Sequence, residues 1–153
     1  MITTETEARE FLRGLFESYN NRDWEKFFGS YVWEDCLFFN GNGMHSGKDK
    51  MIQFWETAYN TNIVRETLME PTNIFIKENE IAALLPLKFH FNKDQVYAGV
   101  QFKKGDEVML KCADFYKFRN GKIYEFTVYR FSLWWLKDWA ENWEEFEKIV
   151  RRV

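Results

Sequence analysis

Hydrophobic and polar residues alternate most regularly between Glu107 and Phe131, on both sides of the dipeptide Asn120-Gly121. An alternation of period two indicates β-strands, and Asn-Gly is a strong signal for a tight hairpin turn. The pattern therefore predicts two long antiparallel strands joined at this dipeptide. One acidic residue, Asp114, lies in the middle of the first strand, between Cys112 and Tyr116.

Apolar residues recur at spacings of three and four in the first part of the chain, which predicts helices. The first helix runs from Thr4 to Asn20, with Thr4 and Glu7 as a capping box. A short helix is expected over 23–30, and a third helix follows His45, with Ser46 and Asp49 able to cap it. The further strands predicted are 36–40, 65–77 with a break at Pro71, 81–91 and 96–102.

A terminal helix is predicted after Ser132, because large apolar residues form a stripe at spacings of four, four, three and four. These residues are Trp135, Trp139, Trp143, Phe146 and Val150. The whole order of elements predicts one α+β domain over residues 1–153. We expect a curved antiparallel sheet wrapped around the N-terminal helices like a cone, with a cavity between sheet and helices.

Aromatic residues make up 20% of the 153 residues, which predicts an aromatic interior or a cavity for a flat, hydrophobic ligand. A net charge of −3 with scattered basic residues argues against nucleic acid as a partner. The sequence shows neither a membrane-length apolar run nor a secretory signal pattern, so we expect no membrane association and a cytoplasmic location. Cys36 and Cys112 lie in apolar runs and are expected to be buried and reduced.

Motifs for metals and nucleotides are absent from the sequence. His45 and His90 are far apart in the chain and neither has a partner at a metal-binding spacing. A phosphate-binding loop, a dinucleotide fingerprint and a nucleophile elbow are also missing. We therefore expect no metal and no cofactor, and any catalysis to be acid/base chemistry.

The face on which Asp114 lies depends on the register of the predicted hairpin. A two-residue turn at Asn120-Gly121 places Asp114 opposite Thr127. A three-residue loop with a glycine bulge places it opposite Phe126. The residues on its face would then be Cys112, Tyr116, Tyr124, Phe126, Val128 and Arg130. We favour this second register because it collects the charged residues Lys111, Lys117 and Glu125 on the opposite face.

Asp114 has two possible roles in such a cavity. Arg130 would lie about 13 Å away along the next strand, at ~3.3 Å per residue, so an ion pair requires both side chains to reach. Without that pair, burial favours a neutral Asp114 that donates a proton or a hydrogen bond, and with it Asp114 is a base or an anchor. A solvent-facing or merely structural aspartate is the ordinary alternative, and Arg130, His45, Tyr19 and Trp55 likewise have structural alternatives as packing or rim residues.

Three stretches resemble the nuclear transport factor 2-like superfamily, which includes ketosteroid isomerase, scytalone dehydratase, limonene epoxide hydrolase and the SnoaL-like polyketide cyclases. They are YNNRDWEKFF followed by WEDCLFFNG, the helix entry HSGKDKMIQFW, and the hairpin ADFYKFRNGKIYEF. They occur in the order found in that superfamily and span nearly the whole chain. The resemblance implies the cone fold, a hydrophobic ligand, and a homodimer formed through the outer face of the sheet.

Position by position, the resemblance to ketosteroid isomerase is incomplete. Asp114 matches the acid that hydrogen-bonds the oxyanion, but Asn40 occupies the position of the general base and cannot abstract a proton. The oxyanion tyrosine falls near Leu15, with Tyr19 one helical turn away. The aspartate of the epoxide hydrolases falls near Val128, and the histidine pair of scytalone dehydratase is not recognisable.

The SnoaL-like branch is what the resemblance then implies, with a single acid/base residue in an aromatic cavity. The predicted function is cofactor-independent isomerisation, cyclisation or dehydration of a small hydrophobic carbonyl compound, polyketide-, terpenoid- or steroid-like. The alternative is a non-catalytic module of the same fold for ligand binding or protein association. The predicted catalytic residues are Asp114, Asn40 and His45. The predicted ligand contacts are Tyr116, Phe126, Val128, Arg130, Cys112, Phe38, Tyr19, Trp55 and Phe89.

Overall fold

The computed structural model describes residues 2–40, 43–59, 64–97 and 100–130, and of Arg130 it describes the backbone alone. The helices are α1 (Glu5–Asn20), α2 (Trp24–Lys26), the π-helical turn η1 (Phe27–Tyr31) and α3 (Lys48–Ala58). The strands are β1 (Val32–Asn40), β2 (Gly43–Ser46), β3 (Val64–Leu68), β4 (Asn73–Lys77), β5 (Glu80–Phe91), β6 (Gln95–Tyr97), β7 (Val100–Phe102), β8 (Glu107–Arg119) and β9 (Lys122–Arg130). The predicted terminal helix lies outside the described residues.

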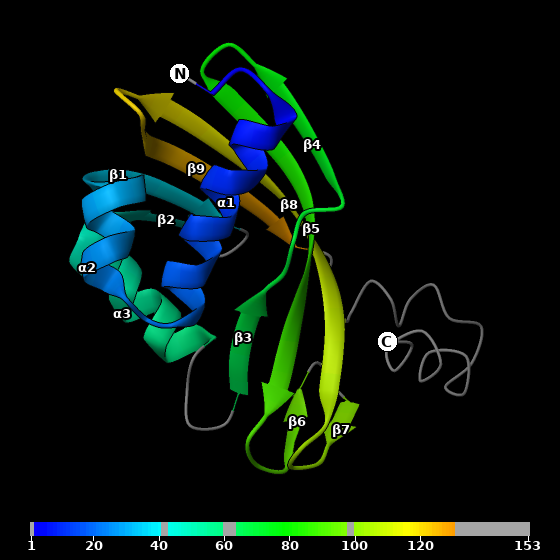
Figure 1. Ribbon diagram of the computed structural model, residues 1–153. Coiled ribbons are helices and arrows are strands. Elements are labelled where there is room, and N and C mark those ends of the chain that lie inside the picture. Colours follow the sequence, from blue (N-terminus) through cyan, green and yellow to red (C-terminus); the bar gives the residue numbers. More distant parts are fainter. Residues whose placement is uncertain (1, 41–42, 60–63, 98–99, 131–153) are drawn as a thin grey trace.

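Seven strands form one sheet in the order β2-β1-β9-β8-β5-β3, with β4 also paired to β5. Figure 1 shows the helices on one side of this sheet, with the long strands β5 and β8 curving past α1. The predicted α+β cone is therefore confirmed. The pairs are antiparallel except for β1 and β9, which run parallel. None of the described helices is long and apolar enough to cross a membrane.

The first helix begins where the sequence predicts. The Thr4 hydroxyl accepts a hydrogen bond from the Glu7 backbone N–H at 3.2 Å, and the Glu7 carboxylate accepts one from the Thr4 N–H at 3.0 Å. This capping box satisfies two of the N–H groups that lack partners within the helix. The buried face of α1 consists of Ala8, Leu12, Leu15, Phe16, Ser18 and Tyr19.

Three predicted elements differ in detail from the structure. Ser46 does not cap α3, because it belongs to β2 and the capping position is Gly47, which makes no side-chain cap bond. The predicted strand 65–77 is two strands, β3 and β4, which pair with successive parts of β5 on either side of the Pro71 break. The predicted strand 96–102 is the small hairpin β6–β7.

Alternation along β5 and β8 decides which side chains face the helices. β5 buries every second residue from Ile81 to Phe91 and leaves Lys88 and His90 on its outer face, as predicted. β8 buries its even-numbered residues from Val108 to Tyr116, and Asp114 is 5% exposed among them. The aspartate therefore faces the interior.

The β8–β9 hairpin combines the turn of one predicted register with the faces of the other. Its turn is the two-residue Asn120-Gly121, with φ of 51° and 78°, the left-handed backbone typical of a type I′ turn. The register shifts by one residue at Tyr124, because Phe118 pairs with Ile123 but Lys117 pairs with Glu125.

The extra residue in β9 places Asp114 opposite Val128, so the predicted partners Thr127 and Phe126 are both wrong. The shift restores the faces of the favoured register, however, and Phe126 and Val128 lie on the side of Asp114. The opposite face carries the ion pair of Lys117 and Glu125, at 2.7 Å.

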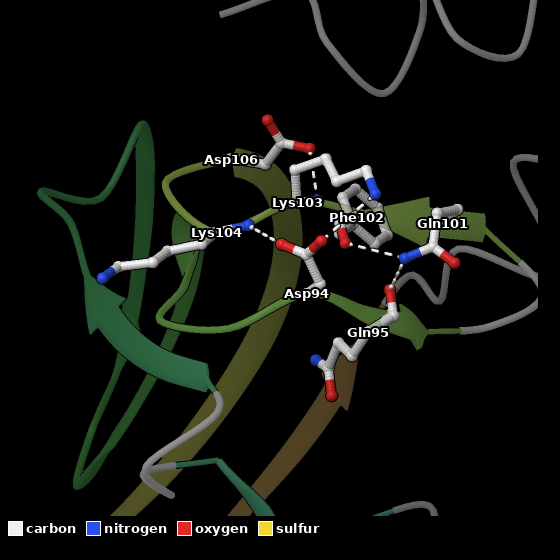
Figure 2. A network of polar contacts seen from close by, with 7 residues as sticks. All are labelled: Asp94, Gln95, Gln101, Phe102, Lys103, Lys104 and Asp106. Carbon is white, nitrogen blue, oxygen red and sulfur yellow. Dashed lines mark hydrogen bonds and ion pairs between the residues drawn. The ribbon is translucent and has the colours of Figure 1, made fainter.

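The β6–β7 hairpin is tied to the turn that precedes β8. Figure 2 shows Asp94 bridging this turn: its carboxylate accepts the Lys104 backbone N–H at 2.8 Å and the Lys103 ammonium at 3.1 Å. The hairpin places Tyr97 against Phe89, with ring centres 5.7 Å apart. It thus adds an aromatic residue next to the C-terminal end of β5.

Gly121→Ala should lower the free energy of unfolding by about 1–2 kcal/mol, because an L-residue is strained at a φ of 78°. Gly29→Ala is the matched control, since a Cβ there meets nothing within 4 Å and φ is not positive. Urea unfolding measures both variants. Equal loss in the two variants would contradict the assigned turn.

Candidate active site

A cavity of about 490 Å³ lies between the helices and the inner face of the sheet. Its walls combine residues of α1, η1 and α3 with residues of β1, β3, β8 and β9. The sequence predicted nine of its lining residues: Tyr19, Phe38, Asn40, Trp55, Cys112, Asp114, Tyr116, Phe126 and Val128. The structure therefore brings these residues together around one space, and their functional roles stay predictions.

Three other predicted residues are placed differently. His45 lies outside the cavity wall, stacked on Phe54 at 4.1 Å, because β2 is the edge strand and Phe38 lies between it and the cavity. Phe89 is fully buried outside the wall, beneath Tyr97. Of Arg130 only the backbone is described, and it pairs with Cys112 of β8.

Aromatic rings form one side of the cavity around Trp55 of α3. The Trp55 ring contacts Tyr19 at 5.4 Å, Phe27 at 5.4 Å and Phe38 at 5.6 Å between ring centres. Phe126 stacks on Phe38 at 4.6 Å and continues this wall onto the sheet. Such a wall suits a flat apolar ligand, because rings pack on it with specific offset geometry.

Asp114 and Tyr116 form a buried polar pair on the sheet side of the cavity. The Tyr116 hydroxyl donates a hydrogen bond to Asp114 Oδ2 at 2.7 Å, and both side chains lie on the inner face of β8, two residues apart. Burial, the negative charge of Asp114 and this hydrogen bond raise the pKa of Tyr116 well above its ordinary value. The phenol therefore stays protonated and acts as a donor.

Asn40 lies in the same row of the sheet as Asp114. Asp114 pairs with Val128 on β9, and Phe39 pairs with Thr127, so Asn40 falls beside Val128 on the other side of β9. Two strand spacings separate the backbones of Asp114 and Asn40, about 10 Å in a sheet. Both side chains line the cavity. The space between a carboxylate and an amide at this separation suits a carbonyl group of a ligand.

A second buried carboxylate, Glu66, was missed from the sequence. It is 3% exposed, lines the cavity, and accepts a hydrogen bond from the Tyr19 hydroxyl at 2.9 Å. Its signal is the alternation of Val64, Glu66 and Leu68, which puts the carboxylate in phase with two apolar residues on β3. The cavity thus contains two pairs of a tyrosine with a carboxylate.

Metal ligands do not gather in the part of the chain that the structure describes, where no group of three or more His, Cys, Asp and Glu is placed to hold an ion. The two cysteines are buried and not bonded to each other. Burial, with smaller contributions from nearby carboxylates, raises the pKa of Cys36 to about 12. Cys36 therefore remains a thiol, which is a poor nucleophile at neutral pH.

The stability of the protein should fall above pH 10 because of Tyr116. The unfolded chain releases this phenolic proton near pH 10, whereas the folded state retains it, so the unfolded state binds fewer protons and the free energy of unfolding falls as pH rises. We expect Tyr116→Phe to remove about 1 kcal/mol per pH unit of this fall, measured by urea unfolding between pH 9 and 11.

Tyr129→Phe is the control for this titration, because Tyr129 is 63% exposed and should keep the wild-type dependence on pH. Identical curves for wild type and Tyr116→Phe would show that Tyr116 titrates normally.

Solved structures share this fold at low sequence identity. A candidate polyketide cyclase of Xanthomonas campestris is 19% identical, with a TM-score of 0.65 over 86% of this chain and 93% of that protein. An NTF2-like protein of Anabaena variabilis is 16% identical, with a TM-score of 0.63 over 86% and 96%. An epoxide hydrolase of Mycobacterium tuberculosis, of the LEH-like type, is 12% identical, with a TM-score of 0.60 over 82% and 84%. These likenesses establish the fold.

No protein of curated function matches the sequence. The family model for the SnoaL-like domain matches residues 12–126, which include the second half of α1, the sheet as far as Phe126 of β9, and most of the residues that line the cavity. The match covers well over half of the chain and agrees with the resemblance seen in the three sequence stretches. The chain belongs to the SnoaL-like family.

Proposed function

We propose that this protein is a cofactor-independent enzyme that transfers a proton on a small hydrophobic carbonyl compound, with Asp114 as the acid/base residue. The observation that carries the proposal is a buried carboxylate, held by a tyrosine hydroxyl, on the wall of an aromatic cavity of about 490 Å³. Structures of the same fold that are described as a candidate polyketide cyclase and an epoxide hydrolase support an enzymatic role.

The hydrogen bond from Tyr116 favours the role of a base for Asp114. A hydrogen bond donated to a carboxylate stabilises its ionised form, and the ionised form is the one that can accept a proton. Asp114 would take a proton from the carbon next to the ligand carbonyl. The electrons of the broken C–H bond would then move to the carbonyl oxygen and give an enolate.

Asn40 would stabilise the enolate from the opposite side of β9. Its amide N–H groups are donors, and Nδ2 is buried in the interior. A donor fixed in an apolar cavity stabilises a developing oxyanion more than the same donor in water does. In a ligand with a double bond conjugated to the enolate, return of the proton from Asp114 to a different carbon would be an isomerisation. Attack of the enolate carbon on a second carbonyl, whose oxygen takes the proton from Asp114, would close a ring.

The rival function is ligand binding without catalysis. It is favoured by Asn40, which stands where the ketosteroid isomerases have their general base. In one form of this rival, aromatic side chains fill the interior and leave no room for a ligand. A cavity of about 490 Å³ does not fit that form. A binding protein would hold the ligand in the same cavity and leave its C–H bonds intact.

The predicted homodimer stays a prediction. The outer face of the sheet carries Leu84, Phe115 and Tyr129, which are 40%, 46% and 63% exposed, and the rings of Phe115 and Tyr129 contact each other. Exposed apolar residues gathered on one face are typical of a protein interface. Sedimentation of the full chain measures its oligomeric state.

Exchange of the hydrogens next to a carbonyl for deuterium tests the proposed step without knowledge of the natural substrate. We expect the protein to accelerate this exchange in bicyclic ketones such as 1-indanone and 2-tetralone, followed by NMR in D₂O. Asp114→Asn should lower the rate by about 10²–10⁴-fold, the usual contribution of a general base, with ketone affinity retained.

Asp35→Asn is the matched control, since Asp35 is an exposed aspartate of the same sheet and should leave the exchange rate unchanged. Binding of the ketones without any exchange would favour the rival. Exchange that survives Asp114→Asn would exclude Asp114 as the base.

A further inference from the structure

We infer that the Tyr19–Glu66 pair is a second polar subsite of the cavity, which accepts a hydrogen bond from a hydroxyl group of the ligand at the end remote from Asp114. The inference rests on the proposed function in so far as both place the ligand in this cavity. It makes Glu66 a specificity-determining residue and leaves the proton transfer to Asp114.

The two carboxylates lie at different ends of the sheet. Glu66 pairs with Phe89 of β5, and Asp114 pairs with Ala83 of the same strand. These partners are six residues apart, about 20 Å along β5 at ~3.3 Å per residue. Moreover, β3 and β8 lie on opposite sides of β5. Curvature of the sheet shortens the direct distance, but one functional group of a small ligand cannot serve both carboxylates.

The chemistry of the Tyr19–Glu66 pair suits a ligand donor. The Tyr19 hydroxyl donates to Glu66 Oε1 at 2.9 Å, and a carboxylate has about four lone-pair directions, so it can accept further hydrogen bonds. The pair lies on the cavity wall between apolar residues such as Leu68 and Phe16. A hydroxyl group that meets a carboxylate in such surroundings gains a charge-assisted hydrogen bond shielded from water.

Arg22 supports this pair from an unusual backbone position. Helix α1 ends in a Schellman motif, in which the Arg22 N–H bonds to Tyr19 O at 3.0 Å and the Asp23 N–H to Ser18 O at 2.9 Å. Arg22 has a φ of 60°, where glycine is the usual residue and any other costs about 1–2 kcal/mol. A strained residue of this kind indicates a task for its side chain.

The Arg22 side chain contacts both Tyr19 and Glu66. The guanidinium lies over the Tyr19 ring, 5.0 Å from its centre, donates to the backbone oxygen of Tyr19, and donates to the backbone oxygen of Glu66 at 3.2 Å. It thereby joins the end of α1 to β3 and fixes both members of the pair. Arg22 is a positioning residue for the subsite.

Arg22 also limits which donor the subsite takes. It is a permanent cation next to the pair, so it offsets the attraction of the Glu66 carboxylate for a ligand ammonium group, while a neutral hydroxyl is unaffected. The ligand therefore combines a carbonyl group near Asp114 and Asn40 with an alcohol or phenol at its other end.

Flavone and 4′-hydroxyflavone test the subsite, because they differ by one hydroxyl at the end opposite the carbonyl. We expect the wild-type protein to bind 4′-hydroxyflavone about tenfold to a hundredfold more tightly than flavone, measured by quenching of tryptophan fluorescence at pH 6. Glu66→Gln should lower this ratio about fivefold to tenfold, since the acceptor loses its charge. Glu70→Gln, a change at an exposed glutamate, should keep the wild-type ratio.

Arg22→Gly provides a second, independent readout, because glycine adopts a φ of 60° without strain and the variant should fold. We expect it to shift the preference between 4′-hydroxyflavone and 4′-(aminomethyl)flavone toward the amine by about tenfold. A structural role for Arg22 alone would leave that preference as it is in the wild-type protein.

Equal affinity of the wild-type protein for flavone and 4′-hydroxyflavone, or binding of neither, would overturn the subsite, as would an unchanged ratio in folded Glu66→Gln. The ketone exchange assay separates this failure from failure of the proposed function. Exchange that depends on Asp114 together with equal flavone affinities would remove the subsite alone. The predicted flavone ratio without any ketone exchange would keep the subsite and remove the proton transfer.

Discussion

The extra residue in β9 determines which side chains share the cavity with Asp114. The pairing of β8 with β5 directs Asp114 inward, but it is the register of β9 that decides whether the adjoining surface is apolar or polar. Without the shift at Tyr124, Glu125 and Thr127 would face the cavity in place of Phe126 and Val128, since one residue exchanges the two faces of a strand. A single bulge therefore keeps the carboxylate in apolar surroundings, where its proton affinity and its hydrogen bonds have the greatest effect on a ligand.

Both carboxylates in this cavity are accompanied by a tyrosine, and the pairing has an energetic reason. A buried carboxylate without a donor costs several kcal/mol, which a domain of this size cannot bear twice. The hydroxyls of Tyr116 and Tyr19 each offset part of that cost with a bond of 2.7 Å and 2.9 Å. Each tyrosine presents one O–H donor, so the carboxylates keep the capacity to accept from a ligand. The same contacts thus stabilise the fold and hold both carboxylates at the cavity wall.

The sequence predicts the fold well and the site in part, and the differences have physical causes. Hydrophobic periodicity and caps are local signals, so α1 and β5 follow from them directly. The inward face of Asp114 follows only when Lys111, Lys117 and Glu125 are placed together on the opposite face. The bulge at Tyr124 reverses the alternation of β9, in which Ile123 is buried before it and Phe126 after it. Neither predicted register combines a two-residue turn with such a bulge, so neither contains the pair of Asp114 and Val128. Glu66 was missed because β3 has only five residues, and so short an alternation is a weak signal. The positions of His45 and Phe89 depend on β2 being the edge strand and on Tyr97 of the β6–β7 hairpin lying over Phe89, which periodicity does not encode.

In the proposed mechanism, the roles of Asp114 and Asn40 are the reverse of those that the ketosteroid isomerase resemblance implies. In that resemblance Asp114 corresponds to a hydrogen-bond donor and Asn40 to a base. Here the Tyr116 hydroxyl donates to Asp114, which makes the aspartate an acceptor, and Asn40 contributes an amide whose N–H groups are donors. The two positions keep their places on either side of Val128, but the proposed base and the proposed oxyanion donor are exchanged. Asn40 by itself is only a lost base, but in the proposed mechanism its amide would stabilise the enolate, so its presence is no stronger an argument against catalysis than for it.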